Sequence, residues 1–160
     1  MAISPTTRQR LQTQGFEGMS VNDLARVEPW LRLTPALCAL IVVVGTVLAE
    51  PVVFFLLAPL AAFGALFPRH PFDFAYNYGL RHLTRTPPLP ANGAPRRFAC
   101  GIASIWIVAI GVSFALGAEG AGYVLGGLMA AVATLVATTH ICIPSMIYRA
   151  AFCRAGTRQA

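Results

Sequence analysis

The hydrophobic residues of this 160-residue chain gather into four long runs. From Leu33 to Phe67 the only charged residue is Glu50, and from Phe98 to Thr139 it is Glu119, and each lies at a tight turn. Runs this apolar predict membrane-spanning helices, because a soluble chain of this size has too little polar surface to cover them. The four predicted spans extend from about Leu33 to Ala49, Val52 to Phe67, Phe98 to Leu116, and Ala121 to Ile143, where Pro144 stops the last one.

The segments between these runs are polar. Residues 1–32 form an N-terminal tail with a short interfacial helix, for which Ser20 and Asp23 provide a capping box. The loop 68–97 follows the first hairpin (33–67). We expect an amphipathic helix near Pro71 to Tyr78 and an extended, proline-rich stretch after it. A basic tail, 144–160, follows the second hairpin (98–143).

The basic residues predict the orientation in the membrane. All twelve are Arg, and every one falls in the N-terminal tail, the central loop or the C-terminal tail. The two short turns carry none, so the positive-inside rule places both termini in the cytoplasm. The predicted fold class is an all-α membrane protein of four transmembrane helices, N-in and C-in, in a bacterial inner membrane.

The two halves of the chain resemble each other. Ala49-Glu50 in the first turn matches Ala118-Glu119 in the second, and each hairpin is followed by a His with a Tyr eight residues later. These pairs are His70 with Tyr78, and His140 with Tyr148. The pattern predicts two tandem hairpins related as a parallel repeat, with an axis near the membrane normal.

Such a repeat would place His70 and His140 at one depth on the Arg-rich face, with Tyr78 and Tyr148 nearby. A pair of imidazoles at matched depth could bind a haem, a pigment metal or a quinone. In the alternative interpretation, each His anchors a helix end at the headgroup level. His70 and Asp73 lack a third ligand at a suitable spacing, so no protein metal site is predicted.

The segment Cys142-Ile-Pro-Ser145 resembles a CxxC motif with Ser in place of the second Cys. A Cys of this kind can attack a disulfide but cannot resolve the product within the motif. Cys38, Cys100 and Cys142 all fall toward the Arg-rich face. They indicate thiol-redox or sulfur-handling chemistry centred on Cys142, or simply packing as small hydrophobic residues.

Besides the His/Tyr pairs and the cysteines, some residues are candidates for contacts with partner subunits or lipids. Gly122, Gly126 and Ala130 form a small-residue stripe that suits either packing inside the bundle or docking on another subunit. Trp30, Arg32 and Arg149 lie where headgroups or partner subunits would contact them. The positive-inside bias explains the basic face, so we expect no nucleic acid partner.

No catalytic constellation is recognisable in the sequence, and the chain is not expected to be an enzyme. The leading hypothesis is a non-catalytic accessory subunit of a larger inner-membrane complex, of respiratory or photosynthetic type. It would have other membrane subunits and lipid headgroups as its partners. The alternatives are a haem-, pigment- or quinone-binding protein using His70 and His140, and a thiol or sulfur protein using Cys142.

The second half of the chain also resembles a known family. The residues that carry the resemblance are Arg97-Phe98 and the ending His140-Ile-Cys142-Ile-Pro-Ser-Met-Ile-Tyr148, together with Pro68-Arg-His-Pro-Phe after the first hairpin. They are similar to the bacterial integral-membrane family catalogued as domain of unknown function 4395, from about Leu33 to Phe152. The resemblance implies that a second Cys often occupies the position of Ser145, and it implies no activity.

Overall fold

A computed structural model describes residues 3–16 and 18–153, and this part of the chain consists of helices and connecting loops. The N-terminal region holds α1 (Pro5–Thr13) and α2 (Val21–Leu31). The long helices are α3 (Leu33–Leu48), α4 (Pro51–Leu66), α7 (Ala94–Ala115) and α8 (Glu119–Thr139). The short helices are α5 (Pro71–Ala75), the π-helix η1 (Tyr76–Leu80), α6 (Arg81–Thr84), α9 (Ile143–Tyr148) and the π-helix η2 (Arg149–Cys153).

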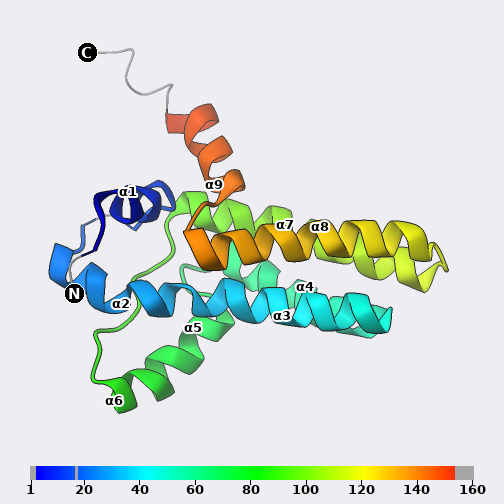
Figure 1. Ribbon diagram of the computed structural model, residues 1–160, viewed down its shortest axis with the longest axis horizontal. Coiled ribbons are helices and arrows are strands. Elements are labelled where there is room, and N and C mark those ends of the chain that lie inside the picture. Colours follow the sequence, from blue (N-terminus) through cyan, green and yellow to red (C-terminus); the bar gives the residue numbers. More distant parts are fainter. Residues whose placement is uncertain (1–2, 17, 154–160) are drawn as a thin grey trace.

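The four long helices lie side by side as a bundle (Figure 1). Within it, α3 packs against α8 and α4 against α7, while α3–α4 and α7–α8 form the hairpins. Local residues set the turns: Ala49 ends α3 in the left-handed conformation, and Pro51 opens α4 at its first position. Gly117, with φ of 73°, makes the second turn.

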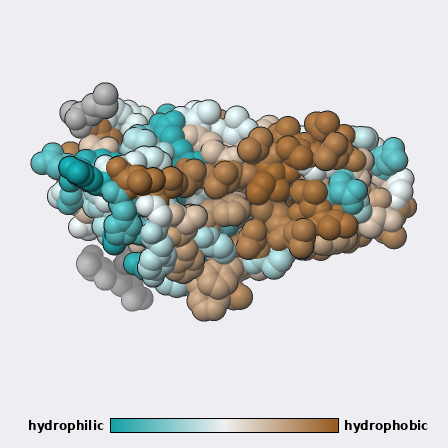
Figure 2. Space-filling view, turned by 90° about the horizontal axis from the view of Figure 1, so that it is seen from below, coloured by the Kyte–Doolittle hydropathy of each residue, from teal (hydrophilic) through white to brown (hydrophobic). Residues whose placement is uncertain are grey.

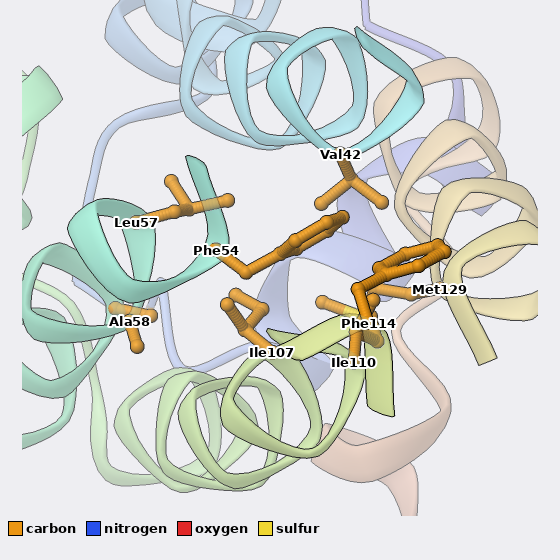
Figure 3. Close-up of a cluster of buried hydrophobic side chains, with 9 residues drawn as sticks. Val42, Phe54, Leu57, Ala58, Ile107, Ile110, Phe114 and Met129 are labelled. Carbon is orange, nitrogen blue, oxygen red and sulfur yellow. The ribbon is translucent and has the colours of Figure 1, made fainter. Parts of the chain in front are cut away.

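Phe54 lies at the centre of the bundle core and is fully buried. In Figure 3 its ring lies among side chains from the other three long helices, including Val42 of α3, Ile110 of α7 and Met129 of α8. Close packing of this kind joins helices in an apolar environment through van der Waals contacts. The apolar runs that define the helices in sequence therefore also supply the core that joins them.

The outer surface of the bundle is apolar as well. Large side chains such as Val47, Leu56, Ile105 and Val124 are more than half exposed. The face of the molecule shown in Figure 2 is broadly hydrophobic along the bundle. Three helical stretches are long and apolar enough to cross a membrane: Val21–Leu48, Ala94–Ala115 and Glu119–Thr139. A fourth arises if Pro51–Leu66 and Pro71–Thr84, bent by 81°, count as one span. These features are compatible with a multi-pass membrane protein.

The N-terminal region is more structured than the polar tail that the sequence predicts. Ser4 accepts a hydrogen bond from the Thr7 amide and caps α1, and Leu11 of that helix is fully buried. Leu11 packs with Val27 of α2 and Tyr76 of η1 in a second hydrophobic cluster. A single buried Leu in a polar segment gives little periodic signal, and for this reason the pattern missed α1. Ser20 caps α2 as predicted.

Helix α8 ends earlier than expected, at Thr139 instead of Ile143. His140 takes the left-handed conformation, and the last carbonyls of the helix accept hydrogen bonds from N-terminal side chains. Arg32 donates to the carbonyls of Ala137 and Thr138, Arg10 to Thr139, and Gln14 to His140. Pro144, expected to stop the fourth span, instead lies in the first turn of α9.

The central loop follows its predicted pattern. Pro71 is the first residue of α5, and the carboxylate of Asp73 accepts the backbone amide of His70 at 2.9 Å, which forms a capping box. After α6 the chain runs without regular structure over residues 86–93, where the prolines lie. The end of the loop is bonded to its beginning, since the backbone amide of Asn92 donates to the Pro68 carbonyl at 2.6 Å.

Candidate functional site

Three cysteines from separate parts of the chain line one cavity inside the polar end of the bundle. Cys38 comes from α3, Cys100 from α7, and Cys142 from the residue that precedes α9. The cavity measures about 150 Å³, and its wall is almost entirely apolar, with Trp106 and Met129 at the bundle side. All three cysteines are free thiols. Cys100 interacts electrostatically with both Cys38 and Cys142.

Cys142 has a position that the other two thiols lack. It lines the inner cavity and also a second pocket, of about 250 Å³, shared with Arg10, His140 and Met146. The buried Ser145 hydroxyl lies 3.0 Å from Cys142 Sγ and 3.1 Å from the Pro95 carbonyl oxygen. Cys142 thus stands between the outer pocket and the inner cavity.

His70 also lines the inner cavity, and its side chain is 2% exposed. Its Nδ1 accepts the backbone amide of Phe72 at 3.3 Å, so a neutral ring carries its proton on Nε2. Burial lowers the pKa of His70 to about 4, although Asp73 opposes this shift. The ring is therefore neutral at physiological pH. Gly64 of α4 makes room for it, because a Cβ there would lie 2.5 Å from His70 Cδ2 and 3.3 Å from Cys100 Sγ.

Arg96 is the charged residue among the described side chains that line the cavity. It is 8% exposed, and its guanidinium lies over the Phe16 ring at 5.0 Å from the centroid. The cavity wall is almost entirely apolar, so the guanidinium contributes almost none of its surface. Other arginines donate to carbonyl groups, namely Arg10, Arg26, Arg32, Arg97 and Arg149. Within residues 3–16 and 18–153, the Arg96 guanidinium has no such acceptor and no ion pair.

The two predicted histidines do not line the same cavity. His140 turns away toward α2, where its Nε2 lies 2.7 Å from Glu28 Oε1, and Arg32 donates to the same carboxylate. Burial lowers the pKa of His140 despite this carboxylate, so the ring acts as a neutral hydrogen-bond partner. Tyr78 is 75% exposed and stacks on Phe74, and Tyr148 packs between Phe98 and Phe152. Neither tyrosine lines the cavity.

The predicted contact residues mostly serve the fold. Gly122 packs against Phe114 and Gly126 against Thr46, while Ala130 packs against the core, so this stripe joins helices within the bundle. Trp30 packs on the Tyr76 ring. Arg32 binds the end of α8, and Arg149 donates to the carbonyls of Gln12 and Thr13 in α1.

Sequence reasoning missed Arg96 and Gln14 as residues of the site. Arg96 is one of twelve arginines that the topology already explains, and Gln14 lies in the segment taken for a tail. The break at His140, which turns Cys142 inward, gave no sequence signal. Among the described residues, no group of three or more His, Cys, Asp or Glu side chains is arranged to hold a metal ion.

The comparisons with known proteins identify the family of the chain. No curated protein and no solved structure matches it. The family described as "Domain of unknown function (DUF4395)" matches residues 28–152, a range that contains all three cavity cysteines, His70 and Arg96. The chain therefore belongs to this family.

Proposed function

We propose that this chain is a multi-pass protein of the bacterial inner membrane that performs thiol exchange in its three-cysteine cavity. Cys142 is the reacting thiol and Cys100 the second thiol, and the substrate is a compound with a sulfur–sulfur bond. The observation that carries the proposal is the convergence of three free cysteines, from α3, α7 and the start of α9, on one cavity of about 150 Å³.

The chemistry of exchange follows from these positions. The Cys142 thiolate attacks one sulfur of the substrate, a bond forms between the two sulfurs, and the other half of the substrate leaves as a thiolate. The Cys100 thiolate then attacks Cys142 Sγ, which forms a Cys100–Cys142 disulfide and releases the bound half. Two protein thiols are oxidised and the substrate disulfide is reduced to two thiols. Cys100 thus does the work that Ser145 cannot do within the CxxS motif.

The proposal includes the orientation in the membrane. The two hairpin turns contain no arginine, and the described arginines all lie in the segments at the opposite end of the bundle. The positive-inside rule places this arginine-rich end in the cytoplasm. The pocket beside Cys142 would then open toward the cytoplasm, where low-molecular-weight thiols keep cysteines reduced. The two hairpins would be tandem copies. In support of this idea, the second helix of each hairpin packs on the first helix of the other, α4 on α7 and α8 on α3.

Trapping the mixed disulfide tests this mechanism. A Cys153→Ser background removes the tail cysteine, and the protein reacts with an aromatic disulfide reagent in mild detergent. We expect Cys100→Ser to retain one half of the reagent on Cys142 at least about tenfold longer than the background, because the resolving thiol is gone. Cys38→Ser is the matched control and should resolve normally. Equal lifetimes in Cys100→Ser and Cys38→Ser would remove Cys100 from the mechanism.

Two other hypotheses stay predictions. Purification in mild detergent followed by mass spectrometry tests the accessory-subunit hypothesis, which expects a stoichiometric membrane partner. An absorption spectrum of the purified protein, compared with His70→Ala and His140→Ala, tests the cofactor hypothesis. The structure gives the cofactor hypothesis less support, since His70 lines the cavity while His140 faces Glu28.

A further inference from the structure

The almost entirely apolar wall of the three-cysteine cavity leads beyond thiol exchange in general to a class of substrate. We infer that the cavity binds a small neutral disulfide with apolar substituents, which it takes from the membrane. This inference rests on the proposed thiol function and names its substrate class.

The first argument is where the polar groups of the lining residues find their partners. The Gln14 side chain donates to the His140 carbonyl, and the Thr34 hydroxyl donates to the Asp73 carboxylate, both at 2.8 Å. Nδ1 of His70 likewise accepts a backbone amide. The wall that these contacts leave is almost entirely apolar. A charged or strongly polar ligand would therefore lose its hydrogen bonds to water and find few replacements there.

The second argument is that exchange with a neutral disulfide moves no net charge. The sulfur–sulfur bond of the substrate breaks, and a bond between Cys142 and Cys100 forms. The two electrons that the protein thiols give up reduce the substrate, and their two protons end on the two product thiols. Reactants and products of the whole cycle are neutral, so an apolar cavity penalises neither of them.

The third argument is the size of the cavity. Its volume is about 150 Å³, and an apolar cavity of that size stays free of water and holds a benzene-sized molecule. Dimethyl disulfide is close to benzene in size, whereas a disulfide of two peptides is far too large. The cysteine thiols and the Met129 thioether line the same space and add polarisable contacts for the sulfur atoms of a guest.

The fourth argument is the position of the cavity along the bundle. Trp106 of α7 and Met129 of α8 line it, and the residues before them in sequence, Ile105 and Leu128, are 75% and 52% exposed. The cavity therefore reaches the part of the bundle whose outer surface is apolar, on two helices long and apolar enough to cross a membrane. A compound that dissolves in the membrane becomes concentrated beside these helices, and a hydrophilic one does not.

A titration with dimethyl disulfide tests the inference. In a Trp30→Phe background Trp106 is the remaining Trp, so its fluorescence reports a quenching disulfide in the cavity. Adding Cys142→Ala removes the reacting thiol, and the signal then reports binding. We expect saturable quenching in mild detergent and a higher unfolding midpoint with this ligand. Thiosulfate, a charged sulfur compound of similar size, should produce neither effect.

Two alanines of α7 provide a matched pair of variants. Ala103 lines the cavity, so Ala103→Leu fills it and should weaken binding at least about tenfold. Ala109 is exposed, and Ala109→Leu should bind as the background does, which controls for ligand dissolved in the micelle. Equal binding by the two variants, or equal binding of thiosulfate, would overturn the inference. Ala99→Leu also fills the cavity and keeps the test valid if Ala103→Leu fails to fold.

Reaction rates of the chain that retains Cys142 separate the two proposals. Saturable binding of dimethyl disulfide without a Cys100–Cys142 disulfide would support the binding site and remove the exchange mechanism. Bis(2-aminoethyl) disulfide, which carries two positive charges, should react at least about tenfold more slowly than dimethyl disulfide, because the apolar wall disfavours its charges. Equal rates would support the mechanism and overturn the substrate class.

Discussion

At the scale of residues, the cavity depends on a few close fits. Two hydrogen bonds hold His70: its backbone amide donates to the Asp73 carboxylate, and its Nδ1 accepts from the Phe72 amide. Gly64 leaves the space that the His70 ring occupies. The sequence predicted the capping role of Asp73 from its spacing after Pro71. It could not predict the cavity, because which side chains meet across α3, α4 and α7 depends on helix packing.

Gly64→Ala should disturb the site. The new methyl would lie 2.5 Å from the His70 ring, which is anchored and cannot simply turn away. We expect a loss of about 1–3 kcal/mol in the free energy of unfolding, measured by thermal or denaturant unfolding in detergent. Gly101→Ala is the matched control, since its methyl would meet only Ala65 Cβ at 3.7 Å. A Gly64→Ala protein as stable as Gly101→Ala would show that the fit is looser than described.

His70 should make stability depend on pH. Its pKa in the folded protein is about 4, below the ordinary 6.5, because burial disfavours the charged ring. The unfolded chain therefore binds the proton first as the pH falls. The stabilisation is complete above about pH 6.5 and is lost progressively down to about pH 4, by about 3 kcal/mol.

Unfolding midpoints between pH 7.5 and 4 measure this effect. His70→Asn keeps an N-cap acceptor but cannot titrate, so its pH profile should be flatter than that of the parent. The exposed His82 provides the control, and His82→Asn should leave the profile unchanged. A steep parental slope that persists in His70→Asn would assign the pH dependence to another group, with His140 the next to examine.

At the scale of elements, the N-terminal region completes the bundle by capping α8. Arg10, Gln14 and Arg32 together satisfy the carbonyls from Ala137 to His140, which a helix end leaves without partners. The sequence pattern predicted the four long helices, as well as α2 and α5, because their apolar runs and caps are local signals. It missed α1 and misplaced the end of α8, because both are fixed by contacts between distant segments.

Gln14→Ala should weaken this cap. The Gln14 side chain is 2% exposed and donates to the His140 carbonyl at 2.8 Å, so its loss leaves a buried acceptor without a partner. We expect a loss of about 1–3 kcal/mol and faster hydrogen exchange of the amides after Thr139. Gln9 of the same helix is exposed, and Gln9→Ala should change neither quantity. Identical behaviour of the two variants would contradict the capping role.

At the scale of the whole molecule, the short helices gather at one end of the four-helix bundle (Figure 1). The face shown in Figure 2 is largely hydrophilic at that end and largely hydrophobic along the bundle. The sequence placed Cys38, Cys100 and Cys142 toward one face. The repeat predicted from the sequence also paired His70 with His140. In the structure His70 lines the cavity, whereas His140 contacts Glu28 of α2. The sequence pattern predicts how far along the bundle each residue lies. The direction of a side chain depends also on the local backbone conformation, and His140, in the left-handed conformation, is an example.

The orientation in the membrane is testable with single cysteines in a chain from which all four native cysteines are removed. Glu50→Cys and Glu119→Cys, in the hairpin turns, should react with a membrane-impermeant maleimide added outside spheroplasts. His82→Cys, exposed in the central loop, should react only after the cells are opened. Labelling of His82→Cys from outside would reverse the proposed topology.

The proposed function depends on three thiols that share one cavity, in which Cys100 interacts with the other two. Mild oxidation of the Cys153→Ser protein in detergent, followed by proteolysis and mass spectrometry of cross-linked peptides, measures which thiols can meet. We expect an intramolecular Cys100–Cys142 disulfide as the main product, and a Cys38–Cys100 disulfide when Cys142 is replaced by Ser. Oxidation that leaves Cys100 reduced, or yields only disulfides between separate molecules, would contradict it.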